Sequence, residues 1–376
     1  MKPNNLLGLK KILFLFSYVK TIHTSFSMKK IVLFAAFVGI GCATVQKTLA
    51  QDIHFSQYYN SPLTLNPALA GAYMDNRVSL NYKDQWRSVA TAYKTLAFSY
   101  DMKLFKDKWQ NGYLGAGLNV FSDRAGDANM ATTQINLSIA SHRKLNAHNS
   151  VSLGLQGGYA QRAINTNKLT WDNQYQNGAY DPGLPSGENF ATNKFGLADF
   201  SAGFQWQYGK DEMYISGNDA FKANFGAAYF HVNQPKYSFL ANSSERLYSK
   251  LVMHGNMFIG IKNTSSGLVP SFLYTRQGSA QELMVGAMVK YLLKEDSKYT
   301  GFVKGAAVSI GGSYRFQDAV VLQGLLEMGQ YALGISYDIN TSDLSNASNG
   351  RGGIEIMLRF VNPNPFMFKT VWHNIK

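Results

Sequence analysis

Histidines are the side chains beyond the first fifty residues that are best suited to metal binding or catalysis. Six are present, at His54, His142, His148, His231, His254 and His373. His142 and His148 flank a predicted turn and could approach each other. Two imidazoles without a nearby carboxylate make a poor zinc site, however. Exposed turn histidines are the more ordinary interpretation, and we predict no metal ion between them.

Acidic side chains offer a second candidate site. Asp172, Asp181 and Glu188 fall in one long predicted loop, where a calcium ion is conceivable. Their spacing lacks the dense pattern of Asp, Asn and Gly that a calcium-binding loop requires. We therefore expect these acids to be ordinary loop residues in contact with solvent.

Catalysis would need a nucleophile with a base, or an acid–base pair, at the rim of the fold. The sequence contains no Gly-x-Ser-x-Gly element, and none of the histidines lies in a recognisable catalytic motif. The single cysteine, Cys42, lies in the first fifty residues, so the rest of the chain has no thiol for disulfides, nucleophilic catalysis or metal ligation. We predict a non-catalytic protein with no catalytic residues, no cofactor and no metal.

The elements that position these residues are predicted to be strands. Only 16% of the residues are charged, while 14% are aromatic and 34 are glycine. Period-two alternation runs through Val151 to Arg162 and Tyr331 to Asn340, with aliphatic and aromatic side chains on one face and Gly, Ser, Asn and Gln on the other. A soluble sandwich would carry Lys, Glu and Thr on its polar face. The observed alternation is more typical of a membrane barrel.

About fourteen segments have the length that a tilted strand needs to cross a membrane. An even number suits a single-chain bacterial barrel, and closure is required because unpaired backbone groups are costly in lipid. We predict an all-β fold, an antiparallel transmembrane outer-membrane β-barrel of about 14 strands. The predicted strands are 77–86, 92–102, 112–122, 130–143, 149–162, 194–209, 221–233, 250–263, 267–277, 281–292, 304–316, 318–328, 330–340 and 351–361.

The first fifty residues are predicted to be a leader. Met28 to Ala50 has the charged start, apolar stretch and small-residue exit of a secretory signal, so translation is expected to begin at Met28. Acylation of Cys42, as in a lipoprotein, is an alternative. The seven lysines in this stretch supply about half of the formal net charge of +13. The remaining positive charge is dispersed, which argues against nucleic-acid binding.

Two further segments flank the predicted barrel, which covers residues 77–361. Residues 51–76 do not alternate, and their prolines favour turns and a short helical piece. This segment could fold into the barrel mouth as a plug-like element, or lie outside as a periplasmic strap. Residues 362–376 form a C-terminal extension after Ile356-x-Leu358-x-Phe360, which resembles the C-terminal aromatic signature of outer-membrane barrels. Gly115, Gly117 and Gly158 would free space in the lumen, allow strand curvature, or only relieve crowding in the wall.

Several sequence blocks together resemble the PorP/SprF family of type IX secretion proteins. They occur in the family's order along nearly the whole chain after the leader. The departures are the extra N-terminal residues and the extension past Phe360. The blocks are Gln51–Tyr59, Ser61–Leu63, Asn66–Gly71, Asn81–Trp86, Asp199–Phe200 leading to Gly203, His231–Pro235, Ser336–Ser342 and Ala347–Gly350.

The resemblance implies an outer-membrane barrel of the type IX secretion and gliding-motility machinery. Such a protein would help large secreted adhesins or other cargo reach and stay on the cell surface, and would bind periplasmic or lipoprotein components as well as outer-membrane lipid. The alternative function is passive transport of a small hydrophobic solute. Our candidates for partner contact are His54, Phe55, Ser56, Gln57, Tyr58, Tyr59, Asn66, Pro67, Ala68 and Gly71, together with Trp171 and Tyr175, which could equally fold back over the barrel.

Overall fold

The computed structural model describes nine stretches of the chain. These stretches belong to one compact unit, residues 48–376. The predicted leader, its cleavage site and residues 363–376 of the predicted extension lie outside them. The described residues are 52–89, 91–105, 108–109, 111–166, 169–188, 192–210, 220–240, 243–294 and 305–362.

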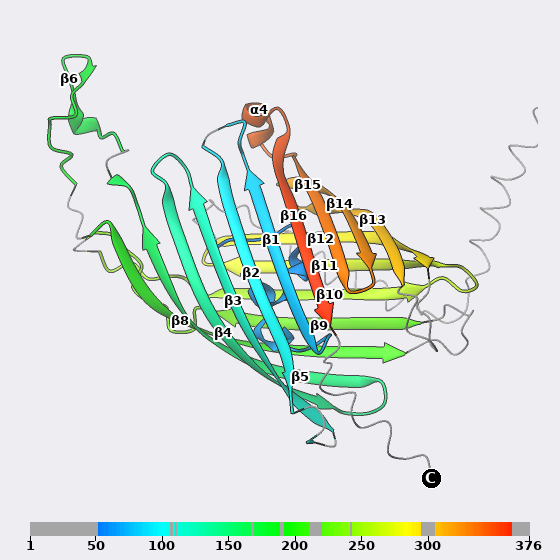
Figure 1. Cartoon of the computed structure of the whole chain (residues 1–376). Coiled ribbons are helices and arrows are strands. Elements are labelled where there is room, and N and C mark those ends of the chain that lie inside the picture. The colour runs from blue at the N-terminus through cyan, green and yellow to red at the C-terminus, as the bar shows by residue number, and fades with distance from the viewer. Residues whose placement is uncertain are drawn as a thin grey trace, which may run out of the picture. The chain divides into compact units, whose positions relative to one another are not determined.

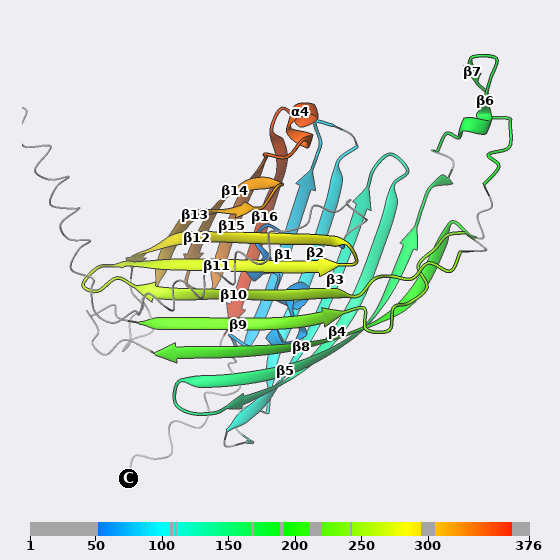
Figure 2. The ribbon, with the colours of Figure 1, turned by 180° about the vertical axis from the view of Figure 1, so that it is seen from behind.

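Within the described residues, fourteen strands close into one antiparallel barrel (Figures 1 and 2). The predicted fold class and number of strands are therefore confirmed. The first strand pairs with the last, so that Asn76 lies opposite Asn362 and Gln85 opposite Gly353. The barrel strands are β1 (Asn76–Gln85), β2 (Tyr93–Leu104), β3 (Gly112–Ala125), β4 (Met130–Lys144), β5 (Asn149–Ala163), β8 (Lys194–Lys210), β9 (Phe221–Phe230), β10 (Lys250–Gly260), β11 (Ser266–Gln277), β12 (Ala280–Lys294), β13 (Ala306–Arg315), β14 (Ala319–Met328), β15 (Tyr331–Asn340) and β16 (Arg351–Asn362).

The two faces of the wall differ as the alternation predicts. On β4, Leu137 and Ile139 point outward and are 64% and 63% exposed, whereas their neighbours Asn136 and Ser138 point inward and are buried. The same pattern continues on β5, where Leu153 and other aliphatic residues face outward. An apolar outer face with a polar inner face is the arrangement that suits strands surrounded by lipid.

The barrel has two unlike ends. We call the end where β1 begins and β16 ends the terminal mouth, and the opposite end the loop mouth. Long connections gather at the loop mouth: 164–193, which contains η5 (Asp172–Gln174), β6 (Tyr175–Gln176) and β7 (Ala179–Tyr180), 231–249, and 341–350, which contains α4 (Leu344–Ser348). Figure 1 shows the β6–β7 hairpin standing clear of the barrel strands.

Residues 52–75, here called the inner segment, lie inside the barrel. The segment is built from the short elements η2 (Tyr58–Asn60), α3 (Pro62–Leu65) and η3 (Pro67–Leu69). Prolines begin the last two elements, where a missing N–H costs nothing. The segment bonds to β15 and β16 on one side and to β5 and β8 on the other, which requires a position within the lumen. Among the described residues, no helix is long and apolar enough to cross a membrane.

Candidate functional site

Ser56 and Gln57 anchor the inner segment to the wall near the loop mouth. Their backbone N–H groups donate to the two carboxylate oxygens of Glu355 on β16, at 2.7 and 3.0 Å. The Ser56 hydroxyl donates to Asp338 on β15 at 2.8 Å, and the ammonium of Lys83 on β1 donates to that hydroxyl at 3.3 Å. One carboxylate thus satisfies two backbone donors that would otherwise be buried without partners.

Buried charges of both signs surround this anchor. Lys83 is only 1% exposed, and Arg315 on β13 is also buried. Arg315 donates to Asp338 at 2.9 Å and to the Ser56 hydroxyl at 2.8 Å, and Lys83 donates to the carbonyl of His54 at 3.1 Å. Removing one partner from such a network leaves an uncompensated buried charge, which is strongly destabilising. The anchor therefore fixes the register of the segment against four strands.

Residues Asn66 to Gly71 bind the opposite wall, where glycines on the inner face make room for them. The Asn66 amide donates to the Phe204 carbonyl on β8 at 2.9 Å, and its oxygen accepts the Ala68 N–H at 2.9 Å. The Ser152 hydroxyl on β5 donates to the Ala68 carbonyl at 3.0 Å. A Cβ atom on Gly154 would lie 2.5 Å from the Pro67 carbonyl carbon, well inside van der Waals contact.

The three glycines singled out in the sequence face two kinds of neighbour: the inner segment or another side chain of the wall. A side chain on Gly115 would overlap the Ala70 carbonyl, and one on Gly117 would lie 2.7 Å from Leu63. The space at both positions is therefore taken by the inner segment. Gly158 instead faces the side chain of Asn136, a neighbour within the wall.

The inner segment ends at the terminal mouth. Gly71 has a φ of +67°, which favours glycine, and its N–H donates to Asp101 on β2 at 2.9 Å. Arg77, the second residue of β1, donates to the same carboxylate at 2.7 Å and to the Leu69 carbonyl at 3.3 Å. Asp75 then pairs with Lys103 near the end of β2 at 3.5 Å.

At the loop mouth, His231 joins the start of the inner segment to the wall. Its Nε2 lies 2.6 Å from Asp52 and its Nδ1 lies 2.9 Å from Asp199 on β8. Burial alone would lower the pKa of His231, but the two carboxylates outweigh it and raise the pKa to about 9. Burial would likewise raise the pKa of Asp52, but His231 and Lys250 hold it well below its usual range. The imidazolium is thus shared between two carboxylates.

This histidine bridge was not among the predicted site residues. His231 and Asp199 each occur in a sequence block that carries the family resemblance, and Asp52 occurs in the first such block. The blocks are distant in sequence, and only the closed barrel shows that they meet. His231 also has a φ of +56°, so the chain leaves strand geometry there. The predicted strand 221–233 was consequently too long, since β9 ends at Phe230.

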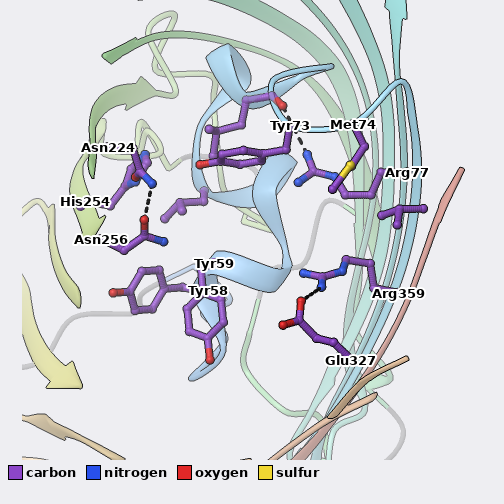
Figure 3. A pocket seen from close by; sticks show the side chains of 14 residues that line it. Tyr58, Tyr59, Tyr73, Met74, Arg77, Asn224, His254, Asn256, Glu327 and Arg359 are labelled. Atoms are coloured by element: carbon purple, nitrogen blue, oxygen red, sulfur yellow. Dashed lines mark hydrogen bonds and ion pairs between the residues drawn. The ribbon is translucent and has the colours of Figure 1, made fainter. Parts of the chain in front are cut away.

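A cavity of about 280 Å³ lies between the inner segment and the wall, towards the terminal mouth (Figure 3). Tyr58, Tyr59 and Tyr73 of the inner segment line it. Across from them, Arg359 on β16 donates to Glu327 on β14 at 2.7 Å. The cavity is therefore part aromatic and part charged, with its charges already paired.

The predicted partner-contact residues fall into two groups. His54–Tyr59 and Asn66–Gly71 are mostly buried against the wall, so direct contact with a partner would require the segment to move. Tyr175, by contrast, is 58% exposed on the β6–β7 hairpin, where its ring packs on that of Tyr180 at 5.4 Å between centroids. Trp171 is half-buried just before it. Contact of either group with a partner protein remains a prediction.

The histidines and acids considered for metal binding do not come together. His142 is buried and contacts the Ala70 carbonyl at 2.7 Å, whereas His148 is exposed and contacts the Gly209 carbonyl. Asp172, Asp181 and Glu188 are exposed in the connection between β5 and β8. In the described stretches, no group of three or more His, Cys, Asp or Glu is arranged to hold a metal ion.

The closed wall, apolar outside and polar inside, defines a transmembrane β-barrel of the outer-membrane type. Residues 47–360 match the family described as type IX secretion system membrane protein PorP/SprF, and the chain belongs to that family. The resemblance predicted from the sequence blocks is therefore confirmed, and the protein is an outer-membrane barrel of type IX secretion.

Solved structures of other outer-membrane barrels are similar at low sequence identity. A TodX mutant titled a monoaromatic hydrocarbon channel has 10% identity and a TM-score of 0.45, with 81% of this chain and 94% of that chain covered. A Pseudomonas aeruginosa FadL homologue has 9% identity and a TM-score of 0.40 over 79% and 92%. BamA from Haemophilus ducreyi has 11% identity and a TM-score of 0.36 over 76% and 70%. These scores are too low to support a conclusion about function. No curated protein is significantly similar to the chain.

Proposed function

We propose that the protein is a non-catalytic barrel of the type IX secretion and gliding-motility machinery. It assists the secretion or surface attachment of large adhesin-type cargo and binds periplasmic or lipoprotein components of the machinery. The observation that carries this proposal is the inner segment, whose backbone bonds to walls on both sides of the lumen. The lumen of this barrel is occupied by its own chain. Such a barrel is better suited to binding partner proteins than to conducting solutes as an open pore.

The inner segment acts in this proposal as a plug. Ser56, Leu63, Asn66 and Ala68 have no exposed surface, so the middle of the segment is packed on all sides. Moving it would break charge-assisted hydrogen bonds to Glu355, each of which contributes roughly 1.5–3 kcal/mol. A plug held in this way stays in place unless a partner supplies compensating contacts.

Partner contact is assigned to the exposed hairpin at the loop mouth. Trp171 and Tyr175 supply aromatic area of the kind that dominates protein interfaces. The hairpin stands clear of the barrel strands (Figure 1), so a partner could reach it without displacing the plug.

Passive transport of a small hydrophobic solute is the alternative. The observation that favours it is the cavity of about 280 Å³ lined by three tyrosines. That volume is close to the lower limit of ordinary small-molecule sites. Solute uptake would require a path past the plug, which the partner function does not.

Affinity capture of the tagged protein from detergent-solubilised outer membranes, followed by mass spectrometry, tests the proposal. We expect a large surface adhesin or secretion-system lipoproteins to be recovered with the wild-type chain and lost in a Trp171→Ala, Tyr175→Ala double variant. Tyr248→Ala is the matched control, because Tyr248 has the same 58% exposure on another connection of the loop mouth. Recovery of the barrel alone, with no secretion defect on deletion, would contradict the proposal and favour solute-uptake assays.

A further inference from the structure

The two ends of the inner segment lie at opposite mouths of the barrel. The N–H of Asp52 donates to Gln277, the last residue of β11, at 3.0 Å. Its carboxylate contacts His231, directly after β9, at 2.6 Å and Lys250, the first residue of β10, at 3.6 Å. All three partners are at the loop mouth. Asp75, at the other end of the segment, pairs with Lys103 at the terminal mouth.

The path between these ends is fixed at several points in sequence order. Ser56 is bound to Asp338 and Glu355 near the loop mouth, Asn66 to Phe204 deeper in the lumen, and Gly71 to Asp101 near the terminal mouth. The segment therefore runs through the whole length of the barrel before β1 begins. Asp52 and the end of β16 consequently lie at opposite mouths of the barrel.

The lengths of the connections indicate which mouth faces the cell exterior. Outer-membrane barrels have short turns on the periplasmic side and longer loops outside. The two longest connections, 164–193 and 231–249, are both at the loop mouth, whereas the connections at the terminal mouth range from 329–330 to 295–305 and none is as long. We infer that the amino terminus of the mature chain is presented at the cell surface, threaded there through its own barrel, while β16 ends on the periplasmic side.

Single cysteines test the topology directly, because the chain has one cysteine and it lies in the expected leader. One variant carries a Gly/Ser spacer with a single cysteine inserted after Gln51. Glu188→Cys in the 164–193 connection reports on the loop mouth, and Lys262→Cys in the 261–265 turn reports on the terminal mouth; both residues are exposed. The wild-type chain is the negative control for background labelling. A membrane-impermeant maleimide is applied to intact cells and to permeabilised cells, and the altered gel mobility of the unheated barrel verifies folding.

We expect the inserted cysteine and Glu188→Cys to be labelled to the same extent before and after permeabilisation, and Lys262→Cys to be labelled only afterwards. An inserted cysteine that behaves like Lys262→Cys would overturn the threading. Labelling of Lys262→Cys but not Glu188→Cys in intact cells would overturn the assignment of the loop mouth to the exterior. Neither readout depends on the secretion partner, so the test stands apart from that of the proposed function.

Discussion

Gly154→Ala should detach the inner segment from Ser61 to Gly71, where α3 packs on η3, while leaving the barrel closed. The added methyl group would lie 2.5 Å from the Pro67 carbonyl carbon and 2.6 Å from the Ala68 Cα, where ordinary contacts are near 3.5 Å. The segment must therefore retreat by about 1 Å, since both atoms belong to its backbone. A shift of that size breaks the hydrogen bond from Ser152 to the Ala68 carbonyl, now 3.0 Å long.

The expected cost follows from these contacts. Overpacking costs about 1–3 kcal/mol, and each of two lost hydrogen bonds, from Ser152 and from Asn66, costs about 1 kcal/mol. The total is about 3–5 kcal/mol, which raises the population of a locally opened segment roughly 150- to 5,000-fold. Local opening of this kind governs the reactivity of a buried reporter.

Ser61→Cys supplies that reporter, because Ser61 is 1% exposed and the substitution changes a single side-chain atom. Thiol labelling of the folded barrel is compared in the Ser61→Cys background, with and without Gly154→Ala. Gly324→Ala is the matched control, since a Cβ there would have no neighbour within 4 Å. If Gly154→Ala fails to give a folded barrel, Ser152→Ala removes one hydrogen bond and should raise labelling about 5-fold. Equal rates for the Gly154→Ala or Ser152→Ala variant and the control would refute the packing argument.

Three further outcomes are expected. Glu355→Gln replaces one of two acceptor oxygens by a donor and should loosen the start of the inner segment by about 2–3 kcal/mol, measured as faster hydrogen exchange there; unchanged exchange would count against the anchor. The pKa of His231 is raised on folding, so its bridge to Asp52 stabilises fully below about pH 6.5 and is lost as the pH rises through about 9. Hydrogen exchange at the start of the inner segment, corrected for intrinsic rates, should become faster as the bridge is lost. If a His231→Gln variant showed the same increase with pH, His231 would be excluded as its cause. Tyr175→Ala should lower the recovery of captured partners without changing the thermal stability of the barrel, because the side chain is mostly exposed; a large loss of stability would show that it packs on the barrel instead.

The sequence by itself determined the wall of this protein. Alternation with a period of two is a local property, so segments such as Val151 to Arg162 predict strands without knowledge of their partners. Closure then follows because lipid does not tolerate unpaired backbone groups. The family blocks, which are also read locally, identified a type IX secretion barrel. Strand ends were less accurate: the prediction continued β10 to residue 263, whereas the strand ends at Gly260, because turn geometry has no such periodic signal.

Only the tertiary structure decided the contents of the lumen. The bridge from Asp52 to His231 joins residues 179 positions apart, and the bond from Ser56 to Glu355 joins residues 299 apart. Neither pairing has a local signature, because each depends on how fourteen strands tilt and close. Likewise, the sequence does not distinguish Gly154 from other glycines in strands. Its role is apparent only from the backbone of Ala68, which packs against it. The path of residues 52–75 was therefore beyond sequence reasoning, since it is fixed by both walls of a barrel that must close first.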